Sequence, residues 1–218
     1  MNIELSYQTQ NIPAPYAYSV VCSFKIANEQ IEVDFNLTYL DRDEVSEDEI
    51  RAEGFSENDD FKWKGCLGPN WEEPIQELLR VNYQSDPKNE FYLHVITDKK
   101  ELGFPNISDD LMIQELIQAV YESAQEEAPL QIEYYNEGKK GSLLWEFAKR
   151  KVTINNTEIA WEEGKTIMQA LYSVEMENPK ISKKPVNQSI SFDGNSWIAF
   201  DVSQFWNSLS EVENRPGK

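Results

Sequence analysis

The sequence predicts a mixed α+β protein, with a twisted, mostly antiparallel sheet and three or four amphipathic helices packed mainly on one face. Two observations lead to this fold class. Hairpin-like strand pairs occur near both ends of the 218-residue chain, which disfavours an all-parallel, doubly wound sheet. Between them, residues 108–129 carry the longest helical pattern of the sequence.

Period-two alternation and turn chemistry predict the strands. Residues 30–40 alternate apolar and polar side chains and follow the β-prone residues 16–26, so the two segments are a predicted hairpin. Asn155 and Asn156 suit a two-residue type I′ turn, which needs a positive φ at both positions. The other predicted strands are 60–66, 91–98 and 130–136, together with a terminal hairpin over 189–202.

The central helix is predicted from its spacing and its ends. Ser108 is placed to cap the amino end, and Pro129 cannot continue the helix. The predicted inner face carries Ile113, Leu116, Ile117, Val120, Tyr121 and Ala124, and the predicted outer face carries Glu115, Glu122 and Glu126. The strands before and after this helix form either a parallel crossover or antiparallel partners, and the pattern leaves both open.

Shorter helices are marked by local signals. Ser46 and Glu49 have the S-x-x-E spacing of a capping box, and Gly54 suits the position just after a helix, so residues 47–53 are a predicted helix. Amphipathic patterns predict further helices near 70–79 and 162–175, and Ser203 is a predicted cap for a short last helix.

The domain prediction is a single α+β domain over residues 1–218, with a subdivision near 128–141 left open and with residues 1–14 and 213–218 loosely ordered. The subdivision is suggested by charge. The net charge of the chain is -19, and residues 1–127 hold 27 acids against 9 bases, whereas residues 128–218 hold 12 against 11.

Composition and charge restrict the class of protein. An apolar content of 40% is typical of a folded chain, and no run of about 18 apolar residues predicts a membrane span. No secretory signal pattern opens the sequence, and two cysteines do not make a disulfide framework, so a cytoplasmic location with reduced thiols is expected. The acidic field disfavours binding to nucleic acid.

No residue pattern in the chain predicts a catalytic, metal or cofactor site. His94 is the only histidine, which excludes zinc sites that need two. Asp41, Asp43 and Glu44 resemble the start of a calcium loop, but Ser46 stands where that loop needs glycine, so no metal is expected. Glycine-rich nucleotide motifs are absent too, and no cofactor is expected.

Two functional hypotheses remain. The first is a non-catalytic protein, of the inhibitor or immunity type, that binds a basic partner protein through its acids. Its candidate binding residues are Asp41, Asp43, Glu44, Glu47, Asp48, Glu115, Glu122 and Glu126. The alternative is an enzyme or small-molecule-binding protein with an aromatic-lined cleft, in which His94 acts with a carboxylate and Tyr92 lies nearby.

Overall fold

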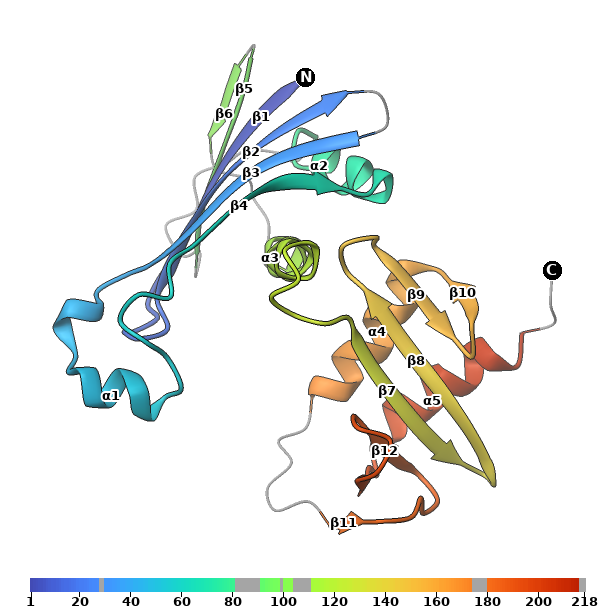
Figure 1. Cartoon of the computed structure of the whole chain (residues 1–218). Coiled ribbons are helices and arrows are strands. Elements are labelled where there is room, and N and C mark those ends of the chain that lie inside the picture. Colours follow the sequence, from blue (N-terminus) through green and yellow to red (C-terminus); the bar gives the residue numbers. More distant parts are fainter. Residues whose placement is uncertain (28–29, 81–90, 99, 104–110, 174–179, 216–218) are drawn as a thin grey trace. The chain divides into compact units, whose positions relative to one another are not determined.

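The chain forms two compact units, Met1–Glu127 (unit 1) and Ala128–Lys218 (unit 2), and the boundary coincides with the step in charge. The computed structural model describes all residues except 28–29, 81–90, 99, 104–110, 174–179 and 216–218 (Figure 1). The predicted α+β class is confirmed, since each unit contains an antiparallel sheet with helices.

Unit 1 is built on a six-stranded sheet in the order β4-β3-β2-β1-β5-β6, and every neighbouring pair is antiparallel. The predicted hairpin of residues 16–40 forms its neighbouring strands β2 and β3. The strands are β1 (Asn2–Thr9), β2 (Tyr18–Ala27), β3 (Gln30–Tyr39), β4 (Phe61–Leu67), β5 (Phe91–Thr97) and β6 (Lys100–Gly103).

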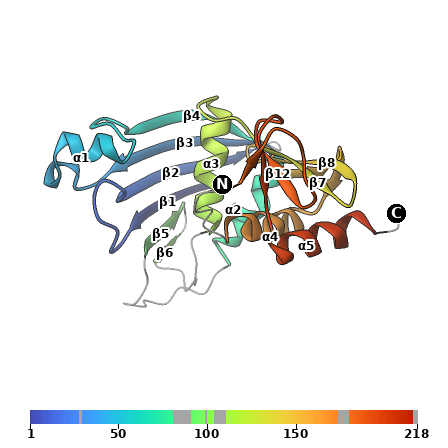
Figure 2. The same cartoon turned by 90° about the horizontal axis from the view of Figure 1, so that it is seen from below.

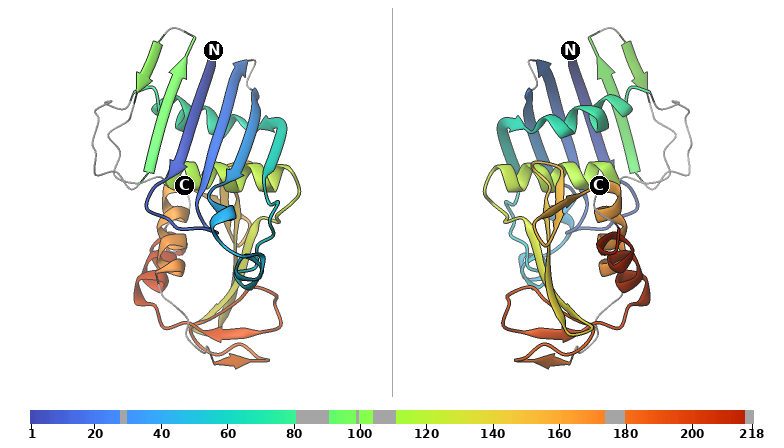
Figure 3. Two further views of the ribbon diagram at one scale, coloured as in Figure 1. Left: turned by 90° about the vertical axis from the view of Figure 1, so that its left-hand side faces the viewer. Right: turned by 90° about the vertical axis from the view of Figure 1, so that its right-hand side faces the viewer.

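One face of this sheet is covered and the other is open. Helices α2 (Glu72–Glu77) and α3 (Leu111–Ser123) cross the strands on the same side, which we call the covered face (Figure 3). Alternate residues of β1, β2, β3 and β5 point to it and are buried. They include Leu5, Cys22, Phe24, Val33, Phe35, Leu37 and Val95. Burial raises the pKa of the Cys22 thiol well above its usual value, so this cysteine behaves as an inert core residue.

The expectation that residues 1–14 are loosely held is wrong for β1. This strand lies between β2 and β5, with Leu5 opposite both Cys22 and Val95. Ile3, Leu5 and Tyr7 are at most 2% exposed. These three residues alternate with polar ones, which is the pattern of a half-buried strand.

Unit 2 contains a seven-stranded sheet in the order β10-β9-β8-β7-β12-β13-β11, again antiparallel throughout. Helices α4 (Trp161–Tyr172) and α5 (Ser203–Glu213) pack against each other (Figure 2). The strands are β7 (Leu130–Asn136), β8 (Lys139–Glu146), β9 (Lys151–Ile154), β10 (Thr157–Ile159), β11 (Ile181–Ser182), β12 (Ser189–Ser191) and β13 (Trp197–Ala199).

Local chemistry shapes unit 2 in ways the sequence partly predicts. Asn155 and Asn156 have φ of 50° and 66°, which confirms the type I′ turn between β9 and β10. Gly164 lets α4 approach β9 closely, because a Cβ there would lie 2.5 Å from a methyl carbon of Val152. The predicted cap at Ser203 is wrong, since α5 begins at that residue and Val202 precedes it without a side-chain cap.

The open question about the strands that flank the central helix is also answered. β5 belongs to the sheet of unit 1 and β7 to the sheet of unit 2, so they do not form a parallel crossover. The helix between them is described from Leu111 to Ser123. Its predicted cap, Ser108, lies outside the described residues.

Candidate functional site

The segment between β3 and β4, residues 41–60, is an ordered structure that we call the acidic excursion. It contains a 3-10 turn at Arg42–Glu44 and helix α1 (Glu47–Ala52), which lies beyond the ends of both strands (Figure 1). The predicted capping box is confirmed: the Ser46 amide donates to Glu49 Oε2 at 2.9 Å, and the Glu49 amide donates to Ser46 Oγ at 3.4 Å. Gly54, with φ of 83°, follows the helix as predicted.

A buried arginine holds the acidic excursion to the rest of unit 1. The Arg42 side chain is 8% exposed and donates to Asp59 Oδ2 at 3.0 Å. It also donates to the carbonyl oxygen of Pro15 at 3.4 Å and to that of Ser56. Its guanidinium carbon lies 3.7 Å from the centre of the Tyr39 ring. The cation therefore neutralises Asp59 and is not available at the surface.

Asp59 owes its charged state to these partners. Burial raises its pKa, but hydrogen bonds from Ser56 and Arg42 and the charge of Arg42 outweigh that effect, so the net pKa is lowered. The Ser56 amide donates to Asp59 Oδ2 at 2.7 Å. Asp59 therefore stays ionised and bridges the arginine to the end of the loop.

Aromatic rings pack around the arginine and support the same loop. Phe55 lies between Tyr16 and Tyr39, with ring centres 5.6 Å and 5.7 Å away. The Tyr16 hydroxyl donates to a carboxylate oxygen of Glu53, and this bond raises the pKa of the tyrosine. The acidic excursion thus has a small apolar base of its own.

The outward side of the acidic excursion is densely negative. Nine of its ten acids are exposed: Asp41, Asp43, Glu44, Glu47, Asp48, Glu49, Glu53, Glu57 and Asp60. The only exposed base, Arg51, is paired with Glu47 at 2.6 Å. A hydrogen bond with the carboxyl group of Glu47, followed by the charge of that group, raises the pKa of Glu57. The first five predicted binding residues are therefore all exposed and belong to this one ordered segment.

The predicted outer face of the central helix is wrong. Glu115 is only 5% exposed, and Glu122 is partly buried. Glu126 is exposed and lies after the end of α3. The buried side of the helix includes Glu115 and Ala119, whereas the predicted inner residues Ile117, Tyr121 and Ala124 are only partly buried. The buried arc is therefore displaced from the predicted face toward Glu115 and Ala119. Glu115 and Glu122 are therefore not part of an exposed acidic surface.

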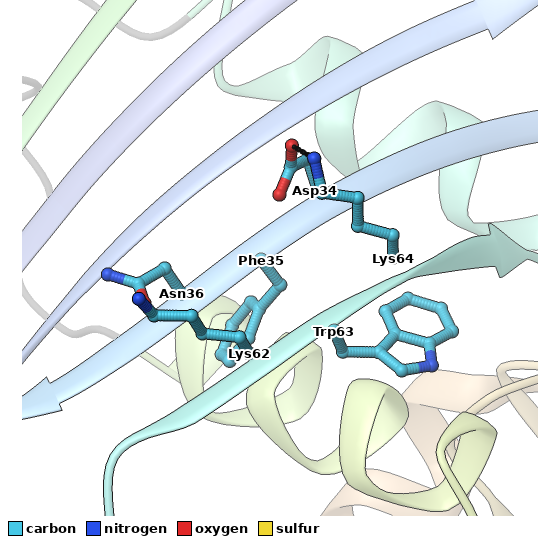
Figure 4. Close-up of a pocket in the computed structure, with 6 residues that line it drawn as sticks. All are labelled: Asp34, Phe35, Asn36, Lys62, Trp63 and Lys64. Atoms are coloured by element: carbon cyan, nitrogen blue, oxygen red, sulfur yellow. Dashed lines mark ion pairs between the residues drawn. The ribbon is translucent and has the colours of Figure 1, made fainter.

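The open face of the unit 1 sheet holds two shallow grooves that share Asp34 and Lys64. The larger, about 620 Å³, extends to Glu4, Ser23 and Lys25, and the smaller, about 370 Å³, lies along β3 and β4 (Figure 4). Lys25 pairs with Glu32 at 2.9 Å and Lys64 pairs with Asp34 at 2.6 Å. Opposite charges therefore neutralise each other across the strands of this face.

The alternative site around His94 lies on the same open face. His94 and Tyr92 alternate with buried residues of β5, are partly buried, and have ring centres 6.3 Å apart. Neither residue lines either of the two grooves. Within the described ranges, no group of three or more His, Cys, Asp and Glu side chains could hold a metal ion.

Sequence reasoning missed the role of Arg42. The available signal was a single arginine at the start of an acidic run, close to Tyr39 and Phe55.

No described helix is long and apolar enough to cross a bilayer. No family model matches the chain, and neither does any curated protein or solved structure.

Proposed function

We propose that this chain is a non-catalytic binding protein that captures a basic protein partner through the acidic excursion. The observation that carries the proposal is the arrangement around Arg42. This cation is buried and paired with the partly exposed Asp59, while nine carboxylates stay exposed on an ordered loop. An inhibitor or immunity-type protein that neutralises a basic target is one form of this function.

Order and charge support the proposal together. A disordered acidic segment would lose conformational entropy on binding, at a cost of about 1 to 2 kcal/mol for each backbone residue fixed. The capping box, the Arg42 contacts and the aromatic base hold the acidic excursion in one conformation before a partner arrives. The clustered carboxylates raise the rate of encounter with a basic surface and lower it for an acidic one.

The test measures binding of the whole chain to a fluorescent 12-residue oligolysine peptide at low and high salt. The variant Asp43→Asn/Glu44→Gln/Asp48→Asn removes three exposed charges and keeps the capping box. The matched control, Glu137→Gln/Asp201→Asn/Glu211→Gln, removes three exposed charges from unit 2. Both variants change the net charge equally.

We expect the excursion variant to bind the peptide about tenfold more weakly, because three exposed ion pairs contribute about 1.4 kcal/mol together. The control should stay within about twofold of the parent chain, and binding should weaken in high salt. Equal losses in the two variants would show attraction to the overall charge and not to this surface. Absence of binding at low salt would also reject the proposal.

A further inference from the structure

Strand β4 ends the sheet of unit 1, and the direction of its backbone groups can be derived. The Leu40 amide donates to the Ala17 carbonyl beside β2, whereas the Tyr39 amide faces the other way and donates to Asp60. Successive residues of a strand direct their N–H and C=O groups to opposite sides. Odd-numbered residues of β3 therefore face β4, and Phe35 forms a hydrogen-bonded pair with its partner Trp63.

It follows that the even-numbered residues of β4 direct their backbone groups away from the sheet. These residues are Lys62, Lys64 and Cys66, and all three are exposed. No described strand pairs with this edge. Three N–H donors and three C=O acceptors therefore point away from the sheet, with the spacing that an added antiparallel or parallel strand would pair with.

The edge lacks two of the usual devices that prevent strand pairing. The sequence of β4 contains no proline, and its register with β3 has no bulge. Lysines on an edge normally protect it by pointing outward. Here Lys62 and Lys64 extend back across β3, toward Asn36 and Asp34 (Figure 4). The backbone of β4 is therefore left unobstructed by its own side chains.

The covered side of the same edge offers an apolar platform. The Trp63 indole lies over Gly65, where a Cβ would come within 2.2 Å of the ring, and the indole is only partly buried. Phe61 stacks on Tyr121 of α3, with ring centres 4.6 Å apart. An added strand would place alternate side chains against this platform.

We propose that β4 receives an extended basic segment of the partner, which adds to the sheet as a seventh strand. This inference rests on the proposed function and names how the partner is bound. Charge complementarity acts at the beginning of β4, where Asp60 and the acidic excursion lead into the strand, and the Lys64 charge farther along is paired with Asp34. Backbone hydrogen bonds along the edge provide the docking, and apolar residues alternating with the bases pack on Trp63.

The experiment uses two peptides of equal charge and the full chain. The probe alternates lysine and valine over ten residues, and the control peptide replaces valine by proline, which removes N–H donors. Lys64→Pro deletes one outward donor of β4 without touching the bonds to β3, and Lys64→Ala is its match, because both lose the ion pair with Asp34. Circular dichroism checks that each variant is folded.

We expect Lys64→Pro to bind the lysine–valine probe at least about tenfold more weakly than Lys64→Ala. The proline removes one hydrogen bond to the added strand, and its ring occupies the position of the outward N–H group. In the parent chain, amide hydrogen exchange at Lys62, Lys64 and Cys66 should slow when the probe is added. The proline peptide should produce no such protection. If Lys64→Pro does not fold, Cys66→Pro and Cys66→Ala form a second pair of the same design.

Two outcomes would overturn strand addition. If the probe binds and the excursion variant weakens it, but the three outward amides gain no protection, the proposed function stands and this docking mode does not. If the probe and oligolysine both fail to bind at low salt, the two proposals fail together.

Discussion

Replacement of Arg42 by alanine is the sharpest test of how the acidic excursion is held. The substitution removes the cation from Asp59 and leaves the carbonyl oxygens of Pro15 and Ser56 without this donor. It also removes a guanidinium stacked on Tyr39. Pro15 is buried and Asp59 is only partly exposed, so water can replace the arginine only in part.

The size of the effect follows from burial. Breaking a buried ion pair on one side costs about 3 to 5 kcal/mol. The Asp59 side chain is 32% exposed, so water compensates in part and the lower value, about 3 kcal/mol, applies. For a unit of 127 residues this corresponds to a melting temperature lower by about 10 °C.

The assay is thermal and urea unfolding of the full chain, with Arg51→Ala as the matched control. Both variants lose one positive charge, but Arg51 is 65% exposed and pairs only with neighbouring acids of α1. Its replacement should cost less than about 0.5 kcal/mol. If the melting temperatures of the two variants differ by less than about 2 °C, Arg42 does not hold the acidic excursion as argued.

Three further predictions concern single groups. Because its pKa is lowered, the Asp59 carboxylate stabilises the fold above the unfolded pKa of about 4 and loses this effect as pH falls toward the folded pKa. The free energies of unfolding of Asp59→Asn and the parent, measured in urea, should therefore differ at pH 7 and differ much less at pH 3. Gly164→Ala should lower the free energy of unfolding by about 1 to 2 kcal/mol, although alanine has the better helix propensity. A double-mutant cycle with Val152→Ala should show a coupling energy of at least about 1 kcal/mol, and additive effects would contradict the close contact. Ser46→Ala should cost about 1 kcal/mol and speed amide exchange within α1, and unchanged exchange there would count against the cap.

The sequence predicts best where local rules and tertiary structure agree. Alternation over residues 30–40 identified the buried face of β3, and the capping box and the Asn155-Asn156 turn were correct because short-range hydrogen bonds and φ preferences decide them. β1 was missed because a central strand is defined by partners far along the chain.

The candidate site was only partly predictable for the same reason. Exposure of the acids in residues 41–60 follows from composition, since unpaired carboxylates are rarely buried. The burial of Glu115 could not be predicted from the helical period, because it depends on which arc of α3 is covered. The role of Arg42 depends on Pro15 and Asp59, which reach it from different loops.

The central position of β1 has a consequence for biosynthesis. Leu5 pairs with Val95, so one edge of β1 has no partner until the 90 residues that follow Leu5 have been made. At about 5 to 20 residues per second, that interval is about 5 to 20 s. During this time the nascent chain exposes an apolar strand edge, and unit 1 is expected to complete its sheet only when β5 emerges, before most of unit 2 has been synthesised.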